Sequence, residues 1–193
     1  MARFTVPVIY GSVRTERKGI RAARYIVRRL RSYDVDPVLI DPMEKQLPLL
    51  DKMYKEYEAG TAPAVLEELA GLYRKADAFV VVSGEYNQTI PPALANILDY
   101  FLEEYFWRPG GIVSYSGGRY AGTRAAMNLR SMLPEMGIIT LPTMIQIARV
   151  QDTFDEDGMP ADPGMDRYTA TFFDELVWYM KALGAARAQG VPY

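Results

Sequence analysis

Three short polar segments of the chain each follow an apolar run and carry side chains that could hold a single ligand. They are Gly11-Ser12-Val13-Arg14, Gly84-Glu85-Tyr86-Asn87 and Ser116-Gly117-Gly118. The carboxyl ends of parallel strands lie along one edge of a sheet, and the loops that follow them meet there. The spacing of these segments therefore predicts one ligand site built from three loops.

The first loop has the residues of an anion site. A helix N-terminus presents unpaired backbone N–H groups and a partial positive charge, which favour a phosphate. Ser12 adds a hydroxyl donor, and Arg14 and Arg17 add forked, charge-assisted hydrogen bonds. Gly19 allows the backbone to approach a ligand closely. The loop is neither a Walker loop nor a three-glycine dinucleotide fingerprint, so a monophosphate fits better than a pyrophosphate.

The second and third loops carry groups that suit a planar ring. Tyr86 offers an aromatic surface, and Asn87 can both donate and accept hydrogen bonds. The glycines of the third loop let backbone amides lie close to a ring, and Arg119 could place positive charge beside the pyrimidine edge of a flavin. Each loop alone is also consistent with an ordinary turn. Taken together, the three loops indicate a flavin.

The composition excludes much of the usual catalytic chemistry. The chain has no cysteine and no histidine, which excludes thiolate nucleophiles, cysteine zinc sites, the Ser-His-Asp triad and histidine metal clusters. An enzyme of this composition would leave the difficult step to a cofactor, and hydride transfer through a flavin fits that constraint. We therefore expect no catalytic side chain and no metal site. The acidic run Asp152–Gly158 lacks calcium-loop spacing and is read as a turn.

Length and charge predict one globular domain over residues 1–193. The chain has 193 residues, 49% hydrophobic and 24% charged, and a formal net charge of -2, which argues against nucleic-acid binding. Its apolar stretches are too short to cross a membrane, and its N-terminus does not resemble a secretory leader. These features predict a cytoplasmic protein.

Short apolar runs alternate with helical periodicity, which predicts an α/β fold: a doubly wound, five-stranded parallel sheet with helices on both faces. Strands are expected at Phe4–Tyr10, Asp36–Ile40, Ala78–Ser83, Gly111–Tyr115 and Ile138–Ile147, the last interrupted around Pro142. Helices are expected at Gly19–Tyr33, at Thr61–Ala76 with Thr61 as its cap, from Pro92 to the aromatic cluster ending at Trp107, at Gly122–Met136 and at Asp166–Ala188. The three polar loops then follow the first, third and fourth strands.

Further motifs in the same order resemble the NADPH-dependent FMN reductase family over most of the chain. Besides the three loops they are Leu47-Pro48-Leu49-Leu50-Asp51, the run Ala76–Val82, Pro92-x-Leu94-x-Asn96-x-Leu98-Asp99, and Gly122 with Arg124-Ala125 and Leu129-Arg130. The resemblance implies a flavodoxin-like fold that binds FMN without a covalent bond. Many relatives have proline where this chain has Gly84, and glycine there predicts a more mobile loop and an altered ring environment.

The resemblance also implies which residues bind the cofactor. The phosphate is expected among Ser12, Arg14, Arg17, Gly19 and Ile20. The isoalloxazine is expected against Gly84, Glu85, Tyr86 and Asn87, with Ser116, Gly117, Gly118 and Arg119 at its other edge. Relatives reduce flavins, quinones, azo dyes, nitro compounds or chromate, commonly as homodimers or homotetramers. The aromatic cluster Tyr100, Tyr105, Phe106 and Trp107 is a candidate subunit interface.

These observations predict an oxidoreductase that works in two half-reactions. NADPH or NADH delivers a hydride to the flavin N5 and leaves, and a small electron acceptor then takes its place. Two alternatives stay open. One is a flavodoxin-like single-electron carrier, although such carriers tend to be more acidic than a net charge of -2. The other is a phosphate-binding regulatory module on the same fold.

The segment Arg14–Arg31 holds eight basic residues and one acid, Glu16. It could guide the anionic NADPH, but a solvated helix face is the simpler interpretation.

Overall fold

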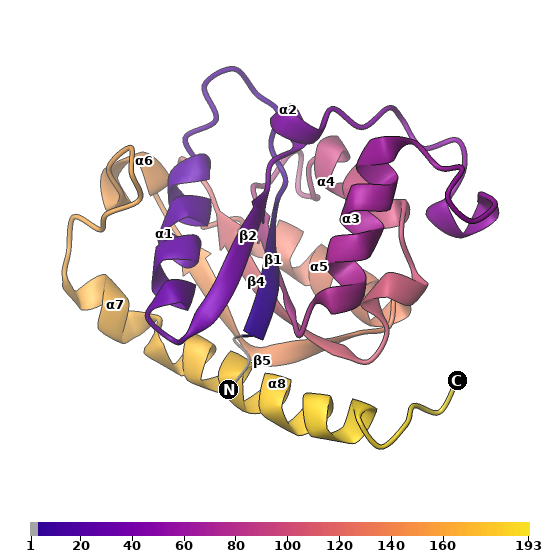
Figure 1. The fold of residues 1–193 in the computed structure, drawn as a ribbon. Coiled ribbons are helices and arrows are strands. Elements are labelled where there is room, and N and C mark those ends of the chain that lie inside the picture. Colours follow the sequence, from indigo (N-terminus) through magenta and orange to yellow (C-terminus); the bar gives the residue numbers. More distant parts are fainter. Residues whose placement is uncertain (1–3) are drawn as a thin grey trace.

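The computed structural model describes residues 4–193 and contains one five-stranded parallel sheet, in the order β2-β1-β3-β4-β5. The strands are β1 (Phe4–Tyr10), β2 (Val35–Ile40), β3 (Phe79–Ser83), β4 (Arg108–Tyr115) and β5 (Ile138–Ile147). All five strands end along one edge of the sheet, the upper edge in Figure 1. The doubly wound α/β architecture predicted from the sequence is confirmed.

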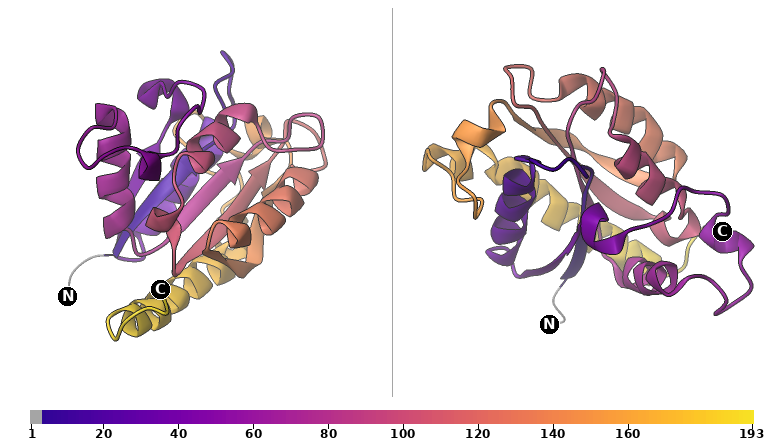
Figure 2. Two further views of the ribbon diagram at one scale, coloured as in Figure 1. Left: turned by 90° about the vertical axis from the view of Figure 1, so that its right-hand side faces the viewer. Right: turned by 90° about the horizontal axis from the view of Figure 1, so that it is seen from above.

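Helices cover both faces of the sheet (Figure 2). One face carries α1 (Ile20–Arg31) and α8 (Ala170–Arg187), and the other carries α3 (Ala64–Lys75), α4 (Pro92–Asp99) and α5 (Thr123–Glu135). Shorter helices are α2 (Pro42–Lys45), α6 (Val150–Thr153) and α7 (Gly164–Tyr168), with 3-10 turns at Tyr54–Glu56 and Glu103–Tyr105. The sheet therefore separates two hydrophobic cores.

The sequence of β3 explains why it lies at the centre. All five of its residues are buried, as expected for a parallel strand covered on both faces. Because successive side chains point to opposite faces, Val80 and Val82 pack in the core under α1, while Phe79 and Val81 pack in the core under α3 and α4. An uninterrupted apolar run is thus the signal for the strand that carries the second polar loop.

Helix α4, which the sequence predicted to continue from Pro92 to Trp107, is shorter than its periodicity predicts. It ends at Asp99, and the chain turns so that Phe101 and Tyr105 pack against Tyr73 of α3. The spacing of the aromatic residues resembles a continuing helix, but burying these rings beside α3 favours a turn. Of the proposed interface cluster, Tyr100 and Tyr105 are therefore core residues, and only Phe106 and Trp107 stay partly exposed.

Three other local expectations are revised. The Thr61 side chain does not cap α3; its hydroxyl donates to the Glu58 carbonyl, and the helix begins after Pro63. The last helical segment is divided at Thr169 into α7 and α8. The strand β5 is continuous through Pro142, yet its pairing with β4 shifts there. The predicted interruption is therefore wrong, and the irregularity is confined to the pairing of the two strands.

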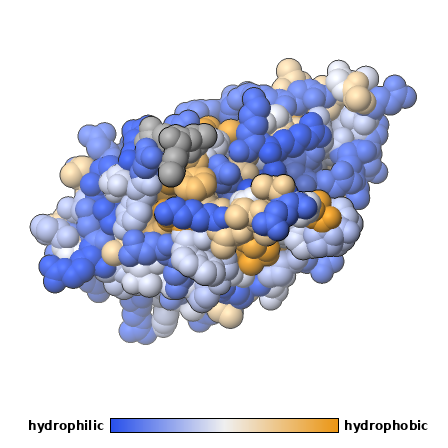
Figure 3. Space-filling view, turned by 60° about the horizontal axis from the view of Figure 1, so that its bottom comes forward, coloured by the Kyte–Doolittle hydropathy of each residue, from blue (hydrophilic) through white to orange (hydrophobic). Residues whose placement is uncertain are grey.

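No helix within residues 4–193 is long and apolar enough to cross a membrane. Figure 3 shows the lower side of the molecule, away from the edge where the strands end. Hydrophilic residues dominate this surface, and hydrophobic ones form only small areas.

Candidate active site

A cavity of about 210 Å³ lies where the loops after β1, β3 and β4 meet. Nine residues predicted to bind a cofactor line it: Ser12, Arg14, Arg17, Gly19, Gly84, Glu85, Tyr86, Ser116 and Gly117. Five further residues complete the lining: Glu16, Lys18, Tyr115, Val150 and Gln151. The topology therefore brings together segments that are more than a hundred residues apart in the sequence.

The anion end of the cavity is formed by the first loop. Ser12 is only 3% exposed, and its hydroxyl oxygen lies 2.8 Å from the Tyr86 hydroxyl oxygen. Arg17 donates to the Asp41 carboxylate and to the Ser12 carbonyl, and its guanidinium lies over the Tyr10 ring. The hydrogen bond with Asp41 raises the pKa of Arg17. Arg17 is thus a permanently charged and firmly held cation.

Two buried tyrosines lie beneath the first loop. The Tyr115 hydroxyl donates to the Tyr10 hydroxyl at 3.2 Å, and the Tyr10 hydroxyl donates to the Arg17 carbonyl at 3.4 Å. Burial raises the pKa of both tyrosines above the ordinary value. Both groups therefore stay neutral and act as hydrogen-bond donors at physiological pH.

Glu85 connects the second loop to α5. Its carboxylate accepts from the Arg124 backbone N–H at 2.9 Å and from the Arg124 guanidinium at 3.3 Å. A negative charge at a helix N-terminus is stabilised by the helix dipole and by the free N–H groups of the first turn. Although Glu85 borders the cavity, its hydrogen bonds hold the second loop in place.

The third loop is held by the segment that follows β5. The Val150 N–H donates to the Ser116 carbonyl, and the Gln151 side-chain amide donates to the Gly117 carbonyl, both at 3.1 Å. Val150 and Gln151 were not among the residues predicted from the sequence, because they lie between the fifth predicted strand and the acidic run Asp152–Gly158. An apolar-polar pair three residues after the end of the fifth strand was the available signal.

Four predicted residues do not line the cavity: Ile20, Asn87, Gly118 and Arg119. Ile20 packs against the hydrophobic core at the start of α1. Asn87, with Gln88, has a positive φ and forms the tip of a two-residue turn closed by hydrogen bonds on both sides. The Arg119 guanidinium donates to the Tyr120 hydroxyl at 2.8 Å.

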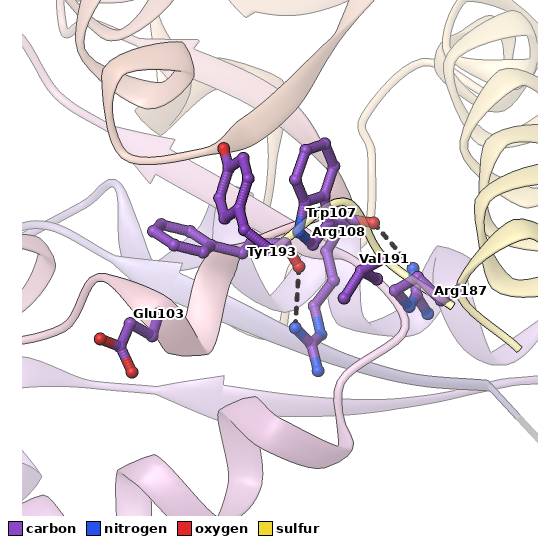
Figure 4. Close-up of a pocket in the computed structure, with 7 residues that line it drawn as sticks. Glu103, Trp107, Arg108, Arg187, Val191 and Tyr193 are labelled. Carbon is purple, nitrogen blue, oxygen red and sulfur yellow. Dashed lines mark hydrogen bonds between the residues drawn. The ribbon is translucent and has the colours of Figure 1, made fainter. Parts of the chain in front are cut away.

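A larger cavity, of about 540 Å³, lies near the start of β4 and is lined by none of the residues predicted to bind the cofactor. Figure 4 shows two arginines in it that are bonded to backbone carbonyls. Arg108 donates to Phe106 at 3.0 Å, and Arg187 donates to Trp107 at 2.9 Å. These bonds stabilise the chain around the aromatic residues. Among residues 4–193, no group of three or more acidic side chains is arranged to hold a metal ion.

Comparisons with known structures define the fold more closely. FerB, a flavoenzyme NAD(P)H:(acceptor) oxidoreductase from Paracoccus denitrificans, superposes with a TM-score of 0.75 at 19% identity, covering 93% of this chain and 98% of that one. A single-site mutant of flavodoxin from Pseudomonas aeruginosa has a TM-score of 0.58 at 14% identity, covering 92% of this chain and 99% of that one. The fold is therefore flavodoxin-like, as predicted.

Sequence comparisons define the family. A curated relative, the FMN-dependent NADPH-azoreductase of Staphylococcus aureus (strain USA300), is 25% identical over 158 residues, which cover 78% of this chain and 80% of that protein. Residues 4–152 match the family model described as NADPH-dependent FMN reductase. This match confirms the resemblance seen in the motifs and, with it, an NAD(P)H oxidoreductase whose cofactors are FMN and NADPH. The chain belongs to the NADPH-dependent FMN reductase family.

Proposed function

We propose that the cavity between the three loops binds FMN and that the protein reduces small electron acceptors with NADPH. The observation that supports this site most directly is the meeting of Ser12, Arg17 and Tyr86 at one cavity that the third loop closes. In the alternative cavity near Trp107, both arginines donate to backbone carbonyls, so that cavity is a poorer site for a phosphate.

The residues at the anion end fit the FMN phosphate. Arg14, Arg17 and Lys18 supply positive charge, and the buried Ser12 hydroxyl supplies a donor. Glu16 is the acidic residue of this loop and is exposed at the rim of the cavity. Charge-assisted hydrogen bonds to a phosphate are among the stronger polar contacts in proteins. We place the phosphate between Ser12 and the cations.

The residues at the other end fit a planar ring. Tyr86 contributes an aromatic side chain, and Gly117 has no side chain to keep a flat ligand away from the backbone. When bound, FMN supplies the two-electron chemistry, taking a hydride from NADPH at N5 and passing the electrons to an acceptor. The protein's side chains orient the ring and exclude water from it. The neutral Tyr10 and Tyr115 add no negative charge beneath it.

Arg14 and Lys18 are the cations best placed to attract NADPH. Both are exposed at the rim of the cavity. Other arginines of the basic segment are occupied: Arg21 donates to the Phe154 carbonyl at 3.0 Å, and Arg28 donates to Asp166 at 3.1 Å. Much of the basic helix face thus binds the chain after β5, so it is a packing surface rather than the solvated face expected from the sequence, and it offers little free charge to steer NADPH.

We propose azo compounds and quinones as the acceptor class, because a curated relative is named for azo reduction and the family resemblance includes quinone reduction. NADPH and the acceptor would use the open side of the ring in turn, which is a ping-pong sequence. A homodimer or homotetramer, a single domain over residues 1–193 and a cytoplasmic location stay predictions from the sequence.

The first experiment is an absorption spectrum of the purified protein, recorded without oxygen before and after NADPH is added. A flavin spectrum that bleaches in one two-electron step and returns when an azo dye or a quinone is added would support the proposal. A stable blue semiquinone would favour the single-electron carrier. A protein that takes up no added FMN would contradict the proposed site.

A further inference from the structure

The ring of Tyr115 fills the space between the first and second loops. A β-carbon built on Gly19 would lie 1.9 Å from the Tyr115 Cζ atom, far inside van der Waals contact. A β-carbon built on Gly84 would lie 3.1 Å from the same atom and from the hydroxyl oxygen. One side chain from the end of β4 therefore touches a glycine of each loop.

Backbone conformation does not explain the glycine at position 19. Gly19 has φ -65° and ψ -15°, a right-handed helical conformation that any residue adopts. Gly84 likewise is not among the glycines with positive φ in residues 4–193. A β-carbon at either position would meet the Tyr115 ring, at 1.9 Å from Gly19 and at 3.1 Å from Gly84. Contact with the ring is thus the physical reason for both glycines.

The hydroxyl of Tyr115 adds a polar connection to the same loop. It donates to Tyr10, which in turn donates to the Arg17 carbonyl. The Tyr10 and Tyr115 rings stack with centroids 6.2 Å apart. Tyr115 is therefore fixed from below and contacts the first loop through both its ring and its hydroxyl.

We propose that Tyr115 is a positioning residue that sets the distance between the anion end and the ring end of the cavity, and that Gly19 and Gly84 are the complement of its ring. This role of Tyr115 rests on the proposed FMN site, because it concerns the distance between Ser12, at the anion end, and the second loop, at the ring end. A ligand that contacts both ends depends on this span, whereas a ligand that contacts one end does not.

A double-mutant cycle tests the contact itself. In the wild-type background, Gly19→Ala is expected to lower Tm, because the new methyl group and the Tyr115 ring occupy the same space. In a Tyr115→Ala background, the same change is expected to lower Tm much less, because the ring that the methyl group would meet is gone. Gly71→Ala is the matched control, since Gly71 lies within α3 and its β-carbon would meet no atom within 4 Å. Its effect should be equal in both backgrounds.

Binding of FMN and riboflavin tests the positioning role. Riboflavin lacks the phosphate, so the ratio of the two dissociation constants reports whether both ends are engaged together. Tyr115→Ala is expected to weaken FMN binding about tenfold relative to riboflavin binding, equivalent to ~1.4 kcal/mol. Tyr115→Phe keeps the ring and is expected to keep most of the wild-type ratio. A purely structural role would lower Tm and leave the ratio unchanged.

The outcomes separate this role from the proposed function. An equal effect of Gly19→Ala in both backgrounds, or a wild-type FMN-to-riboflavin ratio in folded Tyr115→Ala, would overturn the positioning role while leaving the FMN site intact. If the wild-type protein binds neither FMN nor riboflavin, the FMN site fails, and the positioning role toward it fails with it.

Discussion

The Ser12 hydroxyl oxygen lies 2.8 Å from the Tyr86 hydroxyl oxygen, and this contact joins two loops that are separated by 74 positions in the sequence. It connects the anion end of the cavity to its aromatic end. Because Ser12 is buried, its hydroxyl needs a partner, and Tyr86 provides one. A bound phosphate would offer Ser12 a stronger, charged acceptor in place of Tyr86.

Ser12→Ala and Tyr86→Phe remove the same hydrogen bond but should affect FMN differently. Ser12→Ala removes the donor to the phosphate and is expected to raise the FMN dissociation constant about fivefold, or ~1 kcal/mol. Tyr86→Phe leaves the Ser12 hydroxyl free and keeps the aromatic ring, so FMN should bind at least as tightly. Fluorescence titration measures both, with riboflavin as the phosphate-free control. Equal weakening by both variants would argue against a phosphate at Ser12.

Glu85→Ala is expected to destabilise the fold by ~1 kcal/mol, because α5 loses the carboxylate at its N-terminus. The expected fall in Tm is about 2 to 4 °C. Arg124→Ala should cost less, because the Arg124 backbone N–H still donates to Glu85 and half-exposed ion pairs contribute little. Thermal unfolding of both variants is the measurement, and an equal loss for Arg124→Ala would show that the ion pair dominates.

Asp41→Ala is expected to lower the free energy of unfolding by ~2 kcal/mol, because both of its donors lose this partner. Asp41 is 2% exposed, caps α2 by accepting from the Met43 N–H at 2.9 Å, and holds Arg17. Asp41→Asn keeps an oxygen for the cap but loses the charge, so its loss should be intermediate. Urea unfolding checks the order. Equal losses would mean that the charge accounts for the whole effect, and an unchanged Asp41→Asn variant would mean that the charge contributes nothing.

The free energy of unfolding should fall as the pH rises from 10 to 12, in part because Tyr25 loses its proton more readily in the unfolded chain. Burial raises the pKa of Tyr25 from 10.0 to about 12. Below pH 10 both the folded and the unfolded chain keep the proton, and the contribution to stability is complete. Between these values the unfolded chain releases its proton more readily, so the contribution is lost as pH rises. Tyr25→Phe should flatten this fall in urea unfolding, whereas Tyr168→Phe, at an exposed ring, should not.

Local patterns were sufficient to predict most of the fold and much of the site. The five apolar runs became five strands, and nine of the predicted cofactor residues border one cavity. The errors fall where packing competes with local preference. The chain turns after Asp99 because Phe101 and Tyr105 bury their rings beside Tyr73, a contact that helical spacing alone does not reveal.

The sequence by itself determined the chemistry that this protein can use. Without cysteine or histidine, and with a serine, arginines and glycines after its strands, it is suited to binding a redox cofactor. The tertiary structure decided which groups line the cavity. Ser12 and Arg17 line it while bonded to Tyr86 and Asp41, whereas Arg119 is bonded to Tyr120 outside it. Such assignments depend on distances between loops, and these are set by side-chain packing across the sheet.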